Sequence, residues 1–256
     1  MAENLTSIVI IPSRLQAQRF PRKPLASIMG KPMILHVLEE VMKSGLSDVV
    51  VAAGDLEIKE VVEHAGFLAV STDPNHPSGS DRVCEAINII DPYQKKEIII
   101  NVQGDLPVFD ARVLKDLIRV FENPNIDIAT PVTPFKEGES PDDPNRVKVA
   151  VSWRANKKQG RALYFSRSKI PYKADPYYHH IGIYAYRRKA LENFISLPVC
   201  SLEVQENLEQ LRALAAGMWI EVVDIDQAPL SVDTLEDLKS VEAYLREKKE
   251  INSRNQ

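Results

Sequence analysis

The feature that most constrains the fold is a regular alternation, in the first half of the chain, of short apolar runs with amphipathic segments. The apolar runs are rich in β-branched residues and lie at 7–11, 48–52, 97–102 and 126–132. Between them, apolar residues recur with the helical spacing i, i+3, i+4, i+7 in the segments 34–41, 58–65, 83–90 and 114–121. Strands that alternate with helices predict a parallel sheet covered on both faces.

The rhythm changes after Thr133. Strand-like runs at 146–152 and 180–186 follow, with polar connections punctuated by proline. We therefore expect a β-rich inserted lobe at about 134–190 that covers a site or makes a dimer contact. A last strand at 219–225 and helices at 202–217 and 234–248 complete a single domain over 1–256, and we expect a frayed tail at 249–256.

Composition excludes several classes of function. The net charge of −4 argues against a nucleic-acid surface, which requires a basic stripe. The early apolar run ends at Pro12 without a basic leader, so we expect neither a signal peptide nor a membrane span, and a cytoplasmic location. Cys84 and Cys200 have no metal-ligand spacing and no disulfide pattern, which suits a reducing compartment.

The loop that follows the first predicted strand, residues 12–25, is the first candidate binding site. Ligands bind in open parallel sheets where strands end and helices begin. The loop has four basic residues, Arg14, Arg19, Arg22 and Lys23, and no acid, and such a cluster suits a polyphosphate. It contains neither G-x-G-x-x-G nor a Walker lysine. The alternative is a merely solvated basic loop.

Short motifs along nearly the whole chain carry a resemblance to a known family. They lie at 10–14, 19–25, 30–34, 78–82, 101–105, 162–167, 180–184, 208–212 and 232–234. In this order they resemble the motifs of the CMP-Kdo synthetases, the 3-deoxy-manno-octulosonate cytidylyltransferases. The amino-terminal motifs alone are typical of several sugar nucleotidyltransferases. The carboxy-terminal motifs narrow the resemblance to the CMP-Kdo synthetases.

The resemblance implies a fold and a reaction. The fold is α/β, a Rossmann-like nucleotide-diphospho-sugar transferase fold with a predominantly parallel sheet. The implied reaction transfers CMP from CTP to the anomeric hydroxyl of 3-deoxy-D-manno-octulosonate (Kdo), with release of pyrophosphate, for lipopolysaccharide synthesis. We expect CTP and Kdo as substrates, a homodimer, and no nucleic-acid or membrane partner.

The nucleotide side of the implied site begins with Arg14 and Lys23, which match the family residues that hold the CTP phosphates. Lys23 could also neutralise charge that grows on the α-phosphate during attack. Arg19 and Arg22 are expected only to increase the positive electrostatic potential around the phosphates. Ser78, Gly79 and Arg82 resemble the segment that recognises cytosine and ribose, and Gln103 is expected to contact nucleotide and sugar. The alternative for this segment is a helix N-cap at Ser78 or Ser80.

Two aspartates are the implied metal ligands. Asp105 directly follows an apolar strand, so it lies at the carboxyl end of the sheet, where a carboxylate facing a triphosphate suits Mg²⁺. Asp233 matches the family's second metal aspartate. From its position alone, Asp233 or Thr234 is an equally good helix cap, with Glu236 or Asp237 in the capping-box position.

The sugar side is implied by a joint match of residues that, taken singly, are more often structural. These residues are Arg167, His180, Tyr184, Glu209 and Gln210.

The chain differs from the family pattern at two places. Leu106 stands where an acid usually follows Asp105, and the sequence at 53–55 is Ala-Gly-Asp where relatives more often have Thr-Asp. Alternatives to Kdo transfer are an 8-amino-Kdo or other acid-sugar cytidylyltransferase, or a non-catalytic nucleotide-binding domain.

Overall fold

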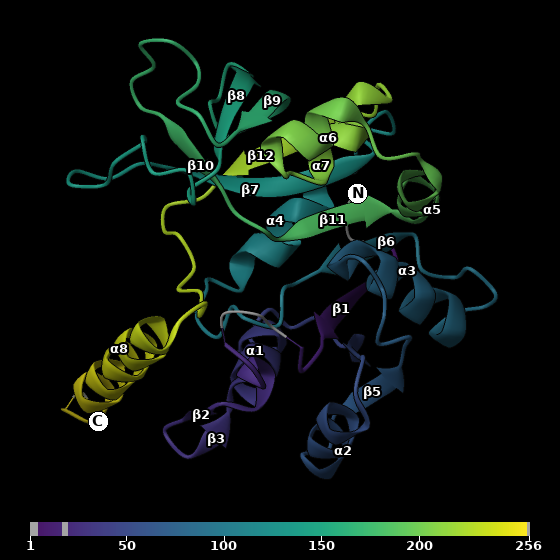
Figure 1. The fold of residues 1–256 in the computed structure, drawn as a ribbon, viewed down its shortest axis with the longest axis vertical. Helices are drawn as coiled ribbons and strands as arrows, with labels where there is room; N and C mark the ends of the chain where they lie inside the picture. Colours follow the sequence, from purple (N-terminus) through teal and green to yellow (C-terminus); the bar gives the residue numbers. More distant parts are fainter. Residues whose placement is uncertain (1–4, 17–19, 255–256) are drawn as a thin grey trace. The chain divides into compact units, whose positions relative to one another are not determined.

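The chain forms two compact units whose segments interleave along the sequence (Figure 1). A computed structural model describes residues 5–16 and 20–254. Unit 1 comprises Met1–Ile8, Tyr93–Asn101 and Arg112–Ala228, and unit 2 comprises Val9–Pro92, Val102–Ala111 and Pro229–Gln256. The predicted β-rich stretch at 134–190 lies within unit 1. The assignment of 1–256 to a single domain stays a prediction.

Unit 2 contains the parallel strands that the alternating pattern predicts. β1 (Ser7–Ser13) pairs in parallel with β4 (Val49–Ala53), and β4 pairs in parallel with β5 (Leu68–Ser71). Every residue of β4 is buried, as in strands covered on both faces. The sequence analysis missed β5, although Leu68, Ala69 and Val70 are apolar; its four residues are exposed or half-buried in the structure.

Helices and short elements complete unit 2. They are η2 (Lys23–Leu25), β2 (Ser27–Ile28), β3 (Lys31–Pro32), α1 (Met33–Met42), α2 (Leu56–His64), α3 (Gly79–Ile90) and α8 (Leu235–Arg254). Apolar residues of α8 pack in a core cluster with Ile28, Met33 and Val108. α8 continues to Arg254, six residues beyond the predicted helix end at Lys248. Fraying of this end stays a prediction.

Unit 1 is built on strands that are mostly antiparallel. Its strands are β6 (Ile98–Asn101), β7 (Ile128–Pro134), β8 (Lys148–Trp153), β9 (Gln159–Ser166), β10 (Tyr178–His180), β11 (Tyr184–Arg187) and β12 (Ile220–Asp224). β7 and β12 are parallel, whereas β6–β11, β7–β11, β7–β10, β8–β10, β8–β9 and β9–β12 are antiparallel.

The expectation of a predominantly parallel sheet is therefore wrong, and the architecture is a mixed α/β one. The reason is chain connectivity. β8 and β9 are joined by five residues, which suffices for a hairpin, whereas parallel neighbours need a crossover of a dozen residues or more.

The helices of unit 1 are α4 (Arg112–Val120), α5 (Arg188–Ser196), α6 (Ser201–Glu206) and α7 (Gln210–Ala215). The predicted helix at 202–217 is thus two helices. The break falls at Asn207, whose left-handed backbone (φ 51°) ends α6. No helix in the described part of the chain combines the length and the apolar character needed to cross a bilayer.

Gly160 on β9 provides a test of this packing. A Cβ at this position would lie 2.8 Å from the Ser152 carbonyl oxygen and 2.9 Å from the Trp153 Cα, both backbone atoms of β8. Because backbone cannot move aside cheaply, we expect Gly160→Ala to lower the free energy of unfolding by about 1–3 kcal/mol in urea denaturation. Leu163→Ala on the same strand removes a side chain that is 59% exposed and should cost much less. Equal unfolding midpoints for Gly160→Ala and the wild type would contradict the close packing of β8 on β9.

Candidate functional site

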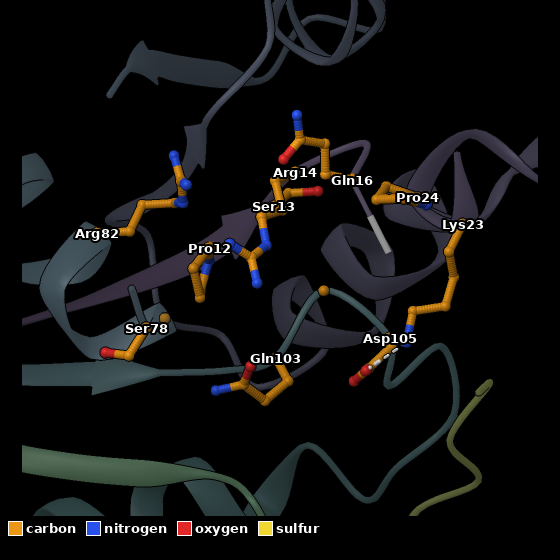
Figure 2. A pocket seen from close by; sticks show the side chains of 12 residues that line it. Pro12, Ser13, Arg14, Gln16, Lys23, Pro24, Ser78, Arg82, Gln103 and Asp105 are labelled. Carbon is orange, nitrogen blue, oxygen red and sulfur yellow. Dashed lines mark hydrogen bonds and ion pairs between the residues drawn. The ribbon is translucent and has the colours of Figure 1, made fainter. Parts of the chain in front are cut away.

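A cavity of about 270 Å³ lies in unit 2 at the carboxyl end of β1 (Figure 2). This volume is close to the lower limit of small-molecule sites. Its lining includes Pro12 and Ser13 from β1 and the loop residues that follow them. Among the lining residues are the six that the sequence predicted for the nucleotide side, Arg14, Lys23, Ser78, Gly79, Arg82 and Gln103, and the predicted metal ligand Asp105.

An ion triad links three distant parts of the sequence at one side of the cavity. The Nζ of Lys23, the first residue of η2, donates to Asp105 Oδ2 at 2.8 Å and to Asp233 Oδ1 at 3.2 Å. Burial lowers the pKa of Lys23, but the charges and hydrogen bonds of Asp105 and then Asp233 outweigh burial, so the pKa is raised. Lys23 is therefore a cation at neutral pH.

The backbone and the helix cap place Asp233 opposite Lys23. The N–H of Val232 donates to the Asp105 carbonyl oxygen at 3.0 Å, which ties the two aspartate segments together. At the start of α8, the N–H of Asp237 donates to Thr234 Oγ1, and Asp237 Oδ2 accepts from the N–H groups of Thr234 and Asp233. Thr234 and Asp237 thus form the capping box. Of the two capping alternatives, the structure favours Thr234.

The two aspartates fit a Mg²⁺ ion that keeps most of its water and phosphate ligands. Their side-chain oxygens share one cationic partner, and hard carboxylate oxygens are the protein ligands that Mg²⁺ takes in ones and twos. Within the described residues, no group of three or more histidine, cysteine or acidic side chains forms a complete metal cage. Leu106 supplies no further oxygen, since it is an apolar side chain only 6% exposed.

Two arginines lie at the other side of the cavity. Arg14 is exposed, and its Nη1 donates to the carbonyl oxygen of His76 at 3.2 Å. Arg82 is only 2% exposed, and its Nη1 donates to Thr72 Oγ1 at 2.7 Å. Burial lowers the pKa of Arg82, and the positive charge of Arg14 lowers it further. Two cations that repel each other in one cavity favour an anionic ligand.

The remaining predicted residues of the basic loop and of the 78–82 segment have local roles. Ser78 is the N-cap of α3: its Oγ accepts from the Asp81 N–H at 3.2 Å, so the capping interpretation holds beside any contact with a ligand. Arg22 forms an ion pair with Glu57 on α2 and does not line the cavity. Arg19 lies outside the described residues.

In unit 1, Arg167 is engaged by backbone carbonyl groups. Its Nε donates to Glu206 at 2.8 Å, its Nη1 to Pro144 at 2.9 Å and its Nη2 to Asn207 at 3.2 Å. The guanidinium thereby joins the segment before β8 to the end of α6. Glu209 is the N-cap residue of α7, and Gln210 beside it is buried.

His180 and Tyr184 are packed against aromatic rings. His180 lies between Phe165 and Tyr184, with ring centroids 5.1 and 5.3 Å away, and its Nε2 is 3.0 Å from Thr130 Oγ1. Burial lowers the pKa of His180 to about 3, with a smaller contribution from His179. Burial also raises the pKa of Tyr184. Both side chains are therefore neutral at pH 7.

Sequence reasoning gave no role to several residues around the cavity. Thr72 and His76 accept hydrogen bonds from the two arginines, and the Asp55 carboxylate accepts from the Leu15 N–H in the basic loop. The departure from the family pattern at 53–55 was the one sequence signal that pointed to Asp55.

The buried histidine predicts a pH dependence of stability. The folded-state pKa of His180 is below its ordinary value of 6.5, so the unfolded chain binds more protons between pH 6.5 and about 3. Stability should therefore fall as the pH is lowered through this window, by about 2 kcal/mol between pH 7 and 5 from this residue. His179, with a pKa of about 4, adds to the effect. Urea denaturation at both pH values should show a smaller fall for His180→Gln than for the wild type. An unchanged fall in His180→Gln would contradict the buried neutral state, and His64→Gln on the exposed face of α2 is the control.

Comparison with known proteins identifies the family of the chain. The sequence pattern of a family described as cytidylyltransferase matches residues 8–225. The 3-deoxy-manno-octulosonate cytidylyltransferase of Paramagnetospirillum magneticum is 50% identical over 246 residues, which cover 96% of this chain and 100% of that protein. The protein of the same name from Rhodospirillum centenum is 48% identical and covers 93% of each chain.

A solved structure extends the likeness to three dimensions. The CMP:2-keto-3-deoxy-manno-octonic acid synthetase complexed with CTP matches with a TM-score of 0.86 and 36% identity, over 95% of this chain and 99% of that chain. The sequence identity and the shared fold both extend over almost the full length of the relatives. The chain therefore belongs to the 3-deoxy-manno-octulosonate cytidylyltransferase family of nucleotidyltransferases.

Proposed function

We propose that the chain transfers CMP from CTP to the anomeric hydroxyl of Kdo, giving CMP-Kdo and pyrophosphate for lipopolysaccharide synthesis. The observation that carries the proposal is a cavity in unit 2 that gathers Arg14, Lys23, Arg82 and Asp105. Support also comes from the printed activity of relatives about 50% identical over the full length, and from the CTP in the solved relative.

The basic side chains of the cavity would bind and polarise the triphosphate. Arg14 and Lys23 supply positive charge for its phosphate oxygens, and Ser78, Gly79, Arg82 and Gln103 would contact base and ribose. In-line attack of the sugar hydroxyl on the α-phosphorus breaks the bond to pyrophosphate, and Lys23 would neutralise charge that develops there. Catalysis of this kind needs positioned cations rather than a covalent nucleophile.

Asp105 and Asp233 would hold Mg²⁺, which when bound supplies Lewis-acid stabilisation of phosphate charge and lowers the pKa of a coordinated hydroxyl. Because Lys23 bonds to both carboxylates, it holds them close together. The two aspartates and the lysine thus belong to one electrostatic unit.

The sugar side of the proposal rests on Gln103 and on Arg167, His180, Tyr184, Glu209 and Gln210. A guanidinium has five N–H donors, and the three bonds of Arg167 leave two for the Kdo carboxylate. His180 and Tyr184 would contribute mainly through packing rather than through charge, since both are neutral and packed on aromatic rings. We also propose a cytoplasmic homodimer in which residues 134–190 serve sugar binding or the dimer contact, without nucleic-acid or membrane partners.

Pyrophosphate release from CTP, Mg²⁺ and Kdo tests the proposal. We expect CTP to be strongly preferred to ATP and GTP, and equal activity with ATP would contradict the cytosine assignment. A panel of Kdo, 8-amino-Kdo and a sialic acid at fixed CTP identifies the sugar. CTP binding without pyrophosphate release for any sugar would instead favour a non-catalytic nucleotide-binding protein.

For Lys23→Ala we expect a loss of about 2.7–4 kcal/mol of transition-state stabilisation, comparable to removal of an oxyanion donor. Steady-state kinetics should show the loss in kcat more than in KM for CTP, because the lysine is proposed to act on charge that develops during attack. Arg22→Ala is the control, since Arg22 lies outside the cavity and pairs with Glu57. If Lys23→Ala retained most of its activity, the alternative interpretation of residues 12–25 as a merely solvated basic loop would be favoured.

For Asp233→Asn we expect loss of most activity and a higher Mg²⁺ requirement, because a neutral amide is a poor ligand for a hard cation. Stability should change little, since Thr234 and Asp237 form the cap. Asp105→Asn should behave alike, and the double variant should be little worse than either single one.

Thr234→Ala is the matched control: it should lower the free energy of unfolding by about 0.5–2 kcal/mol and leave the Mg²⁺ dependence unchanged. An active Asp233→Asn enzyme with the wild-type Mg²⁺ dependence would leave Asp105 as the only metal ligand.

A further inference from the structure

The carboxyl end of β4 carries two residues, Gly54 and Asp55, that have no part in the proposed chemistry. Gly54 lies directly against the guanidinium of Arg82. A Cβ at this position would be 2.6 Å from Arg82 Nη1 and 3.0 Å from its Cζ. Any side chain larger than hydrogen would therefore displace the guanidinium.

Thr72 contacts the same guanidinium through a hydrogen bond. The Thr72 hydroxyl donates to the carbonyl oxygen of Ala53 at 3.1 Å and accepts from Arg82 Nη1 at 2.7 Å. Arg82 Nη2 donates to the Pro74 carbonyl oxygen at 3.4 Å. The strand end thus fixes Arg82 by contact through Gly54 and by a hydrogen-bond relay through Ala53 and Thr72.

Asp55 acts on the basic loop. It is the N-cap residue of α2, yet its side chain makes no cap bond to that helix. Instead its Oδ2 accepts from the backbone N–H of Leu15 at 2.7 Å, next to Arg14. An aspartate at an N-cap normally bonds to its own helix, so this carboxylate is used to hold the loop.

The charge of Asp55 also affects Arg82, one of the two arginines of the cavity. Among the influences on Arg82, Arg14 lowers its pKa and Asp55 raises it. Asp55 therefore offsets part of the repulsion between the two arginines of the cavity.

We propose that Gly54 and Asp55 are positioning residues that set the two arginines of the nucleotide cavity, Gly54 by seating Arg82 and Asp55 by fixing the loop that carries Arg14. This inference rests on the proposed function, because it concerns recognition of CTP. Neither residue touches the reacting atoms in this proposal. Their effect should therefore appear in KM for CTP, with little change in kcat or in KM for Kdo.

Gly54→Ala is the first test. The backbone of Gly54 is outside the left-handed region, so alanine fits its conformation and only the contact with Arg82 changes. We expect KM for CTP to rise about tenfold, the equivalent of about 1.4 kcal/mol. In an Arg82→Ala background the same substitution should change KM less than about twofold, because its target is gone. A purely structural defect would instead reduce the active fraction in both backgrounds and leave KM unchanged.

Thr72→Val is a second route to the same residue, in case Gly54→Ala does not fold. It keeps the side-chain volume nearly constant, removes the hydroxyl that accepts from Arg82, and should also raise KM for CTP.

Asp55→Ala and Asp55→Asn separate the hydrogen bond from the charge. Asparagine keeps an oxygen that can accept from Leu15, whereas alanine does not. We expect Asp55→Ala to raise KM for CTP about tenfold and Asp55→Asn to raise it less. Thermal unfolding of both variants should remain close to the wild type, since no cap bond is lost.

Calorimetric titration of CTP into each protein separates the two possible failures. A wild type that binds no CTP would overturn the proposed function and this inference together. A wild type that binds CTP, with Gly54→Ala, Thr72→Val and Asp55→Ala all binding it equally well, would overturn this inference alone. Equal effects of Gly54→Ala with and without Arg82 would also overturn the role assigned to Gly54.

Discussion

The ion triad of Lys23, Asp105 and Asp233 is the interaction on which the arrangement of the candidate site depends. It joins residues more than two hundred positions apart, with the lysine 15% exposed in its side chain. Burial by itself would favour neutral Lys23, yet the two carboxylates keep it charged. A cation held between two carboxylates also brings these close together, so one contact gathers the three charged groups to which we assign phosphate and metal binding.

The arginines of the cavity make structural contacts and remain part of its lining. Arg14 and Arg82 donate to the segment that contains Thr72 and His76, and they line the cavity at the same time. A guanidinium has enough donors to do both. Burying Arg82 costs free energy unless its donors are satisfied, and Thr72 and Pro74 supply those acceptors. The roles proposed for Gly54 and Asp55 rest on two further contacts: Gly54 lies against this guanidinium, and Asp55 accepts a hydrogen bond from the loop that carries Arg14.

Much of unit 2 could be predicted from the sequence, and much of unit 1 could not. The parallel strands β1 and β4 follow from buried β-branched runs separated by amphipathic helices. The mixed sheet of unit 1 does not, because pairing direction depends on connection length and on neighbours distant in sequence. In the same way, the motif that contains Arg167 gives no sign that three carbonyl groups would bond its guanidinium. His180 is similar, since burial among Phe165 and Tyr184 is decided by packing.

The sequence by itself determined the family, the basic loop at the cavity and the identity of the charged residues that meet there. Local chemistry explains this success: strand ends, basic loops and caps are specified by neighbouring residues. Only the tertiary structure decided that Thr234 rather than Asp233 caps α8, that Lys23 pairs with both aspartates, and that Gly54 faces Arg82. Each of these depends on contacts between segments far apart in the chain, and such contacts leave no periodicity or spacing in the sequence.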